Sequence, residues 1–147
     1  MFRGRFLHTI DPKGRVSIPA KFREAMGDSY AGRLVVVPNE HCLEVHPLDE
    51  WQRIESKLRE QSVFNPEVRK ISRLYISKAK DVDLDAQGRI LIPPDARAEA
   101  GLVKEVTLVG GGLMHFEVWD RRRFEEFDRT HQDDLPTVFE RLSSLGV

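Results

Sequence analysis

Two stretches of the chain share one pattern, and this pattern decides the fold. Residues 10–19 read Ile-Asp-Pro-Lys-Gly-Arg-Val-Ser-Ile-Pro, and residues 84–93 read Leu-Asp-Ala-Gln-Gly-Arg-Ile-Leu-Ile-Pro. Five of the ten positions are identical at an offset of 74 residues. A second block, Leu-Glu-Val at 43–45, matches Phe-Glu-Val at 116–118 at an offset of 73. Two matching blocks in the same order indicate an internal repeat.

The repeat divides the chain of 147 residues into four parts. We expect a first repeat at 5–50, a helical connector at 51–77, a second repeat at 78–123 and a C-terminal helical tail at 124–147. A copy of this length buries too little surface to fold alone, so the two copies are expected to share one core. The prediction is a single pseudo-symmetric domain of the α+β class, dominated by β-strands and flanked by short helices.

The centre of each copy has the chemistry of a tight turn. Apolar and polar residues alternate on both sides of the turn, which is typical of strands. In the first copy, residues 11–14 read Asp-Pro-Lys-Gly, and a type I turn favours Asp, Pro and Gly at its first, second and fourth positions. The sequence therefore predicts a β-hairpin that projects Lys13 and Arg15 from its tip. For Arg15 the alternative is a structural role, in which it pairs with Asp11 across the turn.

Helix signals surround the two copies. Asn65 and Asp120 are expected N-caps, and Thr137 with Glu140 has the spacing of a capping box. Trp119 and Phe124 are expected to form a hydrophobic staple across the second of these N-caps. The helix after the first N-cap is expected to turn four residues inward, namely Val68, Ile71, Leu74 and Tyr75. Leu91 stands where the first copy has Ser17, which predicts that its strand is covered on both faces.

Composition and targeting signals narrow the functional class. Cys42 is the only cysteine, so an internal disulfide is excluded and a reduced, cytoplasmic setting is expected. No apolar stretch reaches the roughly 20 residues that span a bilayer, and no membrane partner is expected.

Positive charge is concentrated in the first copy. The formal net charge of the chain is −1, yet residues 1–23 contain six Lys and Arg residues against one acidic residue. Between residues 80 and 101, the second copy has three basic and five acidic residues, and Gln87 replaces Lys13. The first copy is therefore predicted to contact an anion, while the second maintains the geometry of the fold.

Catalytic and metal-binding motifs are missing from the sequence. The glycines at 110–112 are not followed by the Lys-Ser/Thr of a phosphate loop. His41, Cys42 and His46 lie together, but no second Cys or His pair completes a zinc set. We therefore expect neither an enzyme nor a cofactor, a metal site or a small-molecule substrate.

Several motifs resemble one family of bacterial regulators. Phe2-Arg3-Gly4, the turn Asp-Pro-Lys-Gly-Arg with its echo Asp-Ala-Gln-Gly-Arg, and Pro47-Leu48-Asp49-Glu50-Trp51 closely resemble the MraZ family. Proteins of this family are associated with the division and cell-wall gene cluster. The resemblance covers nearly the whole chain.

The resemblance implies both a fold and a function. The implied fold is a swapped-hairpin β-barrel, like that of the SpoVT-AbrB-type regulators, with both halves supplied by one chain. The implied function is transcriptional repression by a ring-shaped homo-oligomer that binds direct repeats in double-stranded DNA ahead of its own operon. Such a protein would be associated with the nucleoid. The family's DNA contacts match Lys13, Gly14 and Arg15.

Each of these residues has an expected role on DNA. Arg15 would read guanine O6 and N7, Lys13 would take a base edge or a phosphate, and Gly14 would let the backbone approach closely. Arg3 and Arg5 are added from the local charge alone, as phosphate contacts. A single base contact distinguishes the correct base from a wrong one too weakly for a specific regulator. Several chains must therefore bind together as an oligomer.

A second hypothesis uses the same fold without specific DNA binding. The chain would then be an oligomeric protein-interaction scaffold or an antitoxin-like module that binds a partner protein. The near-neutral total charge and the acidic second copy favour this alternative.

Overall fold

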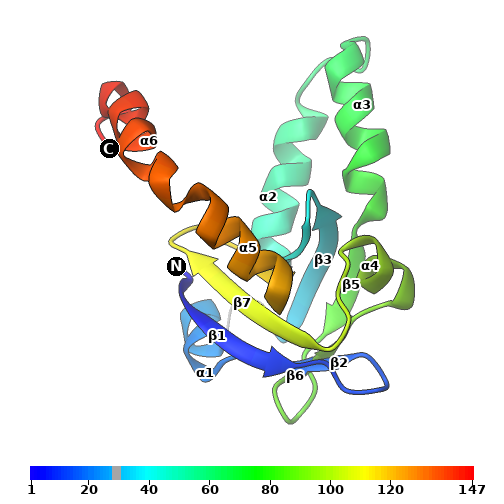
Figure 1. Cartoon of the computed structure of the whole chain (residues 1–147). Helices are drawn as coiled ribbons and strands as arrows, with labels where there is room; N and C mark the ends of the chain where they lie inside the picture. Colours follow the sequence, from blue (N-terminus) through cyan, green and yellow to red (C-terminus); the bar gives the residue numbers. More distant parts are fainter. Residues whose placement is uncertain (28–30) are drawn as a thin grey trace.

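The computed structural model describes residues 1–27 and 31–147 and contains one six-stranded antiparallel sheet (Figure 1). The order of strands across this sheet is β1-β7-β8-β4-β3-β5, and β2 and β6 form a separate two-stranded ladder. The strand bounds are β1 Arg3–Thr9, β2 Arg15–Ser17, β3 Arg33–Asn39, β4 Cys42–Pro47, β5 Lys80–Asp83, β6 Arg89–Leu91, β7 Glu105–Gly111 and β8 Phe116–Asp120.

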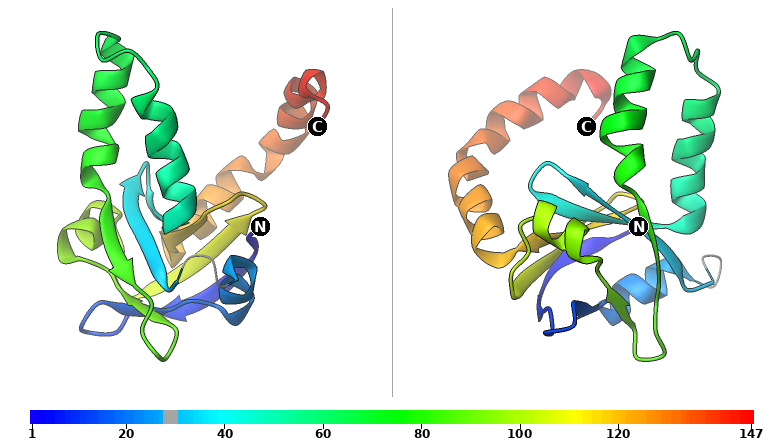
Figure 2. Two further views of the ribbon diagram at one scale, coloured as in Figure 1. Left: turned by 180° about the vertical axis from the view of Figure 1, so that it is seen from behind. Right: turned by 90° about the vertical axis from the view of Figure 1, so that its right-hand side faces the viewer.

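Two pairs of helices project from this sheet as two arms (Figure 2). One arm consists of α2 and α3, and the other consists of α5 and α6. The helix bounds are α1 Ala20–Met26, α2 Leu48–Arg59, α3 Pro66–Leu74, α4 Pro94–Glu99, α5 Arg121–His131 and α6 Leu135–Leu142. Three short 3-10 turns connect or end them, at η1 Ile76–Lys78, η2 Gln132–Asp134 and η3 Ser143–Leu145.

The strands of the two repeats pair with one another. Strand β1 of the first repeat pairs with β7 of the second, and β5 of the second repeat pairs with β3 of the first. The central ladder also joins the two copies, because Val16 on β2 lies opposite Ile90 on β6. Each repeat therefore completes the sheet of the other, as expected for copies that share one core.

The strand pairing does not close a barrel. Strands β1 and β5 are the edges of an open sheet, and no ladder joins them within residues 1–27 and 31–147. The three-residue strands β2 and β6 pair only with each other, so their backbone groups do not connect the two edges. The α+β, β-dominated class is confirmed, whereas the closed barrel expected from the resemblance is not observed.

Aromatic side chains from both repeats fill the common core. The Phe22 side chain is fully buried, and its ring lies 5.4 Å from Phe2, 5.1 Å from Phe6 and 4.8 Å from Phe116, measured between ring centroids. Aliphatic residues from β2, β6 and the long strands surround these rings. The core thus ties α1 of the first repeat to β8 of the second.

Two of the expected helix caps are confirmed and the third is wrong. The Asn65 side chain accepts a hydrogen bond from Glu67 N, and that of Asp120 accepts one from Arg123 N. The staple beside Asp120 is also confirmed, by a contact between the rings of Trp119 and Phe124. Helix α6 instead begins at Leu135, so Thr137 lies inside its first turn and makes no capping bond.

Two expected buried surfaces are exposed. The side chains of Ile71 and Leu74 on α3 are 45% and 66% exposed, because this helix extends beyond the sheet. The prediction that this face turns inward is therefore wrong for Ile71 and Leu74 within one chain, whereas Tyr75 does pack inward, with its ring 5.6 Å from that of Trp51. Leu91 is also exposed, since β6 is a short strand whose outer face has no covering layer. The prediction that its strand is covered on both faces is wrong.

Candidate nucleic-acid interface

The two repeated turns lie at the end of the molecule opposite the α2–α3 arm (Figure 1, Figure 2). We call residues 11–15 the first turn and residues 85–89 the second turn. Gly14 N donates to Asp11 O at 2.9 Å, which confirms the tight turn, and the φ angle of Gly14 is 93°, in a region that favours glycine. Strand β2 pairs with β6 and not with β1, so the expected simple hairpin is wrong. The first turn instead connects the large sheet to the small ladder.

Asp11 organises the first turn through one carboxylate. Its Oδ1 accepts hydrogen bonds from Lys13 N and Arg15 N, both at 2.9 Å, and its Oδ2 accepts one from Arg15 Nε at 2.6 Å. The backbone hydrogen bond from Arg15 and the nearby guanidinium lower the pKa of Asp11. The second turn repeats this arrangement, with Arg89 Nε donating to Asp85 at 3.0 Å. The structural role considered for Arg15 is therefore confirmed.

This pairing still leaves Arg15 able to bind a ligand. In the Arg15 side chain, only Nε donates to Asp11. The two terminal nitrogens of Arg15 have no hydrogen-bond partner among the described residues. Those two nitrogens are the pair that forms a bidentate contact with guanine. Asp11 thus fixes the direction of the guanidinium without occupying the donors that would read a base.

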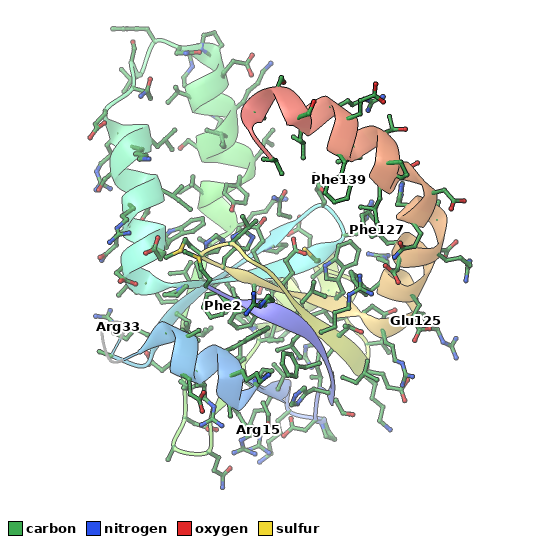
Figure 3. The ribbon with its side chains drawn as sticks, turned by 90° about the vertical axis from the view of Figure 1, so that its left-hand side faces the viewer. Phe2, Arg15, Arg33, Glu125, Phe127 and Phe139 are labelled. Atoms are coloured by element: carbon green, nitrogen blue, oxygen red, sulfur yellow. The ribbon has the colours of Figure 1, made fainter. Side chains whose placement is uncertain are left out.

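The structure brings three of the five predicted contact residues together. Lys13, Gly14 and Arg15 share the first turn, where Lys13 is exposed and has no ion pair with any described residue. Figure 3 shows Arg15 at the end of the molecule away from the α5–α6 arm. Arg3 lies at the far end of β1, opposite Gly111 in β7.

Arg5 is engaged by the α5 helix. Its two terminal nitrogens bind the Asp128 carboxylate at 3.1 and 3.0 Å, and its guanidinium lies 4.9 Å from the centroid of the Phe124 ring. Arg5 therefore differs from Arg15, because a carboxylate already binds both of its terminal nitrogens.

Two arginines near the turns were not identified from the sequence. A Cβ atom built on Gly14 would lie 3.0 Å from Arg97 Cζ, and one built on Gly88 would lie 3.0 Å from Arg23 Cζ. Each guanidinium thus packs on the turn of the other repeat. The signal was available, because Arg23 and Arg97 are identical at the same offset of 74 residues, just beyond the ten aligned positions.

A sequence model of the MraZ family, described as MraZ protein and antitoxin-like, matches residues 1–74 and matches again at 75–145. The chain belongs to the MraZ family. The two matches contain one turn each, so the family model recognises the same internal duplication that the turns display.

Curated members of the MraZ family align along the full chain. A protein of Syntrophobacter fumaroxidans is 40% identical over 146 residues, which is 99% of this chain and 97% of that protein. One from Desulfitobacterium hafniense is 41% identical over 147 residues and the whole of both chains. One from Nitrosospira multiformis is 42% identical, over 97% of this chain and 99% of its own. All three are named Transcriptional regulator MraZ.

This MraZ chain also has a polar cluster on the outer face of its sheet. Ligand atoms of Glu44, His115 and Glu117 lie within 4.8 Å of one another, a spacing that a metal ion could use. Glu44, however, already accepts hydrogen bonds from Asn39 at 2.8 Å, from His46 at 3.0 Å and from the Tyr75 hydroxyl. These donors satisfy the buried carboxylate without a metal.

The same hydrogen bonds make this cluster sensitive to acid. Burial alone would raise the pKa of Glu44, but the three donors outweigh it and lower the pKa to about 2. Ionised Glu44 therefore contributes fully to the stability of the folded chain above the ordinary carboxyl pKa, and this contribution is lost as the pH falls towards 2.

Glu44→Gln is expected to lower the free energy of unfolding by about 1–3 kcal/mol at pH 7, since a charged acceptor is lost from a buried network. The difference from the wild type should shrink as the pH falls from 5 towards 2. Urea unfolding followed by circular dichroism at several pH values measures this. A difference that is the same at all pH values would contradict the assignment.

Within the part of the chain that the structure describes, no helix combines the length and the apolar character needed to span a membrane.

Proposed function

We propose that this MraZ-family chain is a sequence-specific DNA-binding transcriptional regulator that represses its own division and cell-wall operon. Its first turn would contact direct repeats in the promoter, and several chains would bind together as a ring. One observation carries the proposal: the Asp11 carboxylate binds Arg15 Nε and leaves its two terminal nitrogens without a hydrogen-bond partner among the described residues, on a side chain that is 34% exposed. The names of the curated relatives support the regulatory role.

The residues of the first turn would have different roles in DNA recognition. Arg15 would donate both terminal nitrogens to guanine O6 and N7 in the major groove. Lys13 would bind a phosphate or a base edge. Gly14 is buried, so it would act by allowing the positive φ that the turn requires and not by a direct DNA contact. Arg3 would bind a phosphate further along the backbone, and Arg5 would contribute least because Asp128 already pairs with it.

The exchange of strands supports the swapped-hairpin arrangement of SpoVT-AbrB-type regulators. In that arrangement two equivalent halves interleave their strands and present their turns on one side. Here β1 and β5 each pair with a strand of the other repeat, and both turns flank the β2–β6 ladder. We propose that the first turn binds DNA and that the second supports it.

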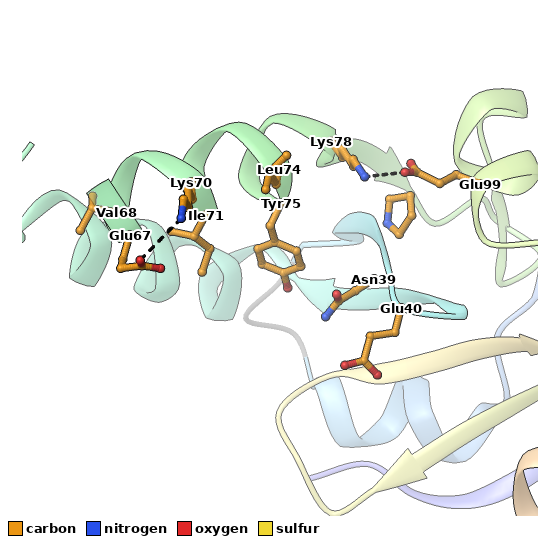
Figure 4. A pocket seen from close by; sticks show the side chains of 11 residues that line it. Asn39, Glu40, Glu67, Val68, Lys70, Ile71, Leu74, Tyr75, Lys78 and Glu99 are labelled. Atoms are coloured by element: carbon orange, nitrogen blue, oxygen red, sulfur yellow. Dashed lines mark hydrogen bonds and ion pairs between the residues drawn. The ribbon is translucent and has the colours of Figure 1, made fainter. Parts of the chain in front are cut away.

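Two apolar surfaces provide for self-assembly. The α3 surface consists of Phe64, Ile71 and Leu74, and the α6 surface consists of Leu135, Val138 and Phe139; all six side chains are exposed. Ile71 and Leu74 line a groove between α3 and the turn that connects β3 and β4 (Figure 4). Phe139 lies on the inner side of the curved α5–α6 arm (Figure 3).

Two different surfaces favour a ring. If the α3 surface of one chain packs against the α6 surface of the next, the contact is head-to-tail, and such contacts close into rings when the rotation allows. Chains arranged in this way present their first turns in the same orientation at each step. That arrangement suits direct repeats in DNA, and the resulting complex would be located at the nucleoid in the cytoplasm.

A second candidate function rests on the same apolar surfaces. They would equally serve an oligomeric scaffold, or an antitoxin-like module that covers a partner protein, and the family description includes the word antitoxin-like. The acidic second copy offers little attraction to DNA and favours this candidate.

Selection from a random DNA pool separates the two functions. The full-length chain is expected to enrich duplexes that contain direct repeats. Binding of such a duplex, measured by fluorescence anisotropy, should weaken with salt with a log-log slope near −0.9 for each phosphate neutralised. A failure to enrich any sequence, together with a flat salt dependence, would favour the scaffold.

A further inference from the structure

A cation of the second repeat lies on the first turn. The guanidinium of Arg97, which belongs to α4, lies so close to Gly14 that a Cβ there would meet Cζ at 3.0 Å and the two terminal nitrogens at 3.1 and 3.2 Å. Gly14 is buried beneath it, and Arg97 itself is partly exposed. The second repeat, which the sequence assigned to fold geometry, therefore places a charge on the turn proposed to bind DNA.

The donors of the first turn are otherwise almost all occupied. Pro12 has no backbone N–H, and the N–H groups of Lys13, Gly14 and Arg15 all donate to Asp11. The backbone of the turn thus offers no free donor to an anion. Only side-chain cations on this surface can bind a phosphate.

Not every cation at the first turn has an acidic partner. The Arg15 charge is balanced by Asp11, so Lys13 alone gives the first turn one uncompensated positive charge. The Arg97 side chain has no ion pair and no hydrogen bond with any residue in the described ranges, and it raises this number to two. An unpaired guanidinium that is held against a turn by packing keeps its donors for an external acceptor.

We infer that Arg97 is a DNA-contact residue that binds a backbone phosphate beside the base read by Arg15. This inference rests on the proposed function. At the first turn, Arg15 of the first repeat reads the base, and Arg97 of the second repeat binds the DNA backbone. Strand exchange makes this possible, because Ile92 N donates to Gly14 O at 2.9 Å and brings the start of α4 to the first turn.

The chain provides a matched comparison in Arg23. Its guanidinium packs on Gly88 of the second turn at the same distance, and its Nε also donates to Ile18 O at 3.2 Å. Arg23→Gln and Arg97→Gln therefore remove the same kind of support from two equivalent turns. Only Arg97→Gln removes a charge from the turn proposed to bind DNA.

Fluorescence anisotropy on full-length proteins tests the inference, with a duplex selected by the wild type from a random pool. Arg97→Gln is expected to weaken binding at least tenfold and to flatten the log-log salt slope by about 0.9 for each first turn bound to the duplex, the value for one lost phosphate contact. Arg23→Gln is expected to remain within threefold of the wild type with an unchanged slope. Melting temperatures of both variants measure the structural cost of losing each guanidinium.

The possible outcomes are distinct. If the wild type itself selects and binds no duplex, the proposed function fails, and the inference fails with it. If the wild type binds and Arg97→Gln binds equally well, the inference alone is overturned. An equal loss in both variants, or a loss in Arg97→Gln with an unchanged salt slope, would assign Arg97 a structural role and would also overturn the inference.

Discussion

Arg15→Ala is expected to abolish the preference of the protein for its operator while the oligomer stays intact. A bidentate arginine contact discriminates by about 1–3 kcal/mol. An assembly that engages two direct repeats loses this contact twice, or about 2–6 kcal/mol, which amounts to a loss of roughly 30-fold or more in specificity. Anisotropy with the selected duplex and with a scrambled duplex of equal length measures the ratio. Size-exclusion chromatography with light scattering reports the oligomer.

Two further variants separate contact from scaffolding. Arg15→Lys keeps the charge but has no guanidinium fork, so it should retain binding to the scrambled duplex and lose the preference for the selected one. Arg121→Ala removes a similar ion pair, from Arg121 Nε to Glu125 at 3.0 Å on α5, and should bind as the wild type does. If Arg15→Ala keeps its preference, the first turn does not read DNA. If Arg15→Ala unfolds while Arg15→Lys binds normally, Arg15 serves only to hold the turn.

The local chemistry of the turn could be predicted from the sequence, but its surroundings could not. Asp and Gly at defined positions, with Pro12 between them in the first turn only, restrict the backbone within four residues, so the first turn and its repeat were correctly predicted. The partner of β2 was not predicted by alternation, because a period of two residues determines which side chains share a face and not which strand lies alongside. Arg97 was missed for the same reason, since its contact with Gly14 depends on the pairing of β2 with β6.

The exposed face of α3 shows another limit of sequence patterns. Apolar residues at helical spacing predicted correctly that Ile71 and Leu74 share one side of a helix. The same spacing does not distinguish a face buried within one chain from a face that another chain covers. Tyr75, at the end of α3, packs on Val35, Val37 and Trp51, but the part of the helix that extends beyond the sheet has no such apolar surface beside it. The prediction of an inward face therefore becomes, at the level of the assembly, a prediction of an interface.

A single charge on either apolar surface is expected to prevent ring assembly. Burial of one leucine or phenylalanine side chain contributes about 1.5–3 kcal/mol, and a buried unpaired carboxylate costs more. Leu74→Glu on α3 and Phe139→Glu on α6 should each weaken the contact between neighbouring chains about 100-fold or more. Both side chains are largely exposed, at 66% and 61%, so the fold of each chain should be unaffected. Light scattering should find each variant to be monomeric at micromolar concentration.

Mixing the two variants tests the head-to-tail arrangement. Leu74→Glu keeps an intact α6 surface and Phe139→Glu keeps an intact α3 surface, so an equal mixture can form one good contact and should give a dimer that grows no further. If each surface instead packed against its own copy, either variant alone would form dimers through the surface left intact, and mixing would add nothing. If both variants have the oligomer mass of the wild type, neither the α3 surface nor the α6 surface is part of the interface. The mixed dimer, with only two first turns, should bind a duplex with two direct repeats far more tightly than either monomer does, because the second contact then forms at a high effective concentration.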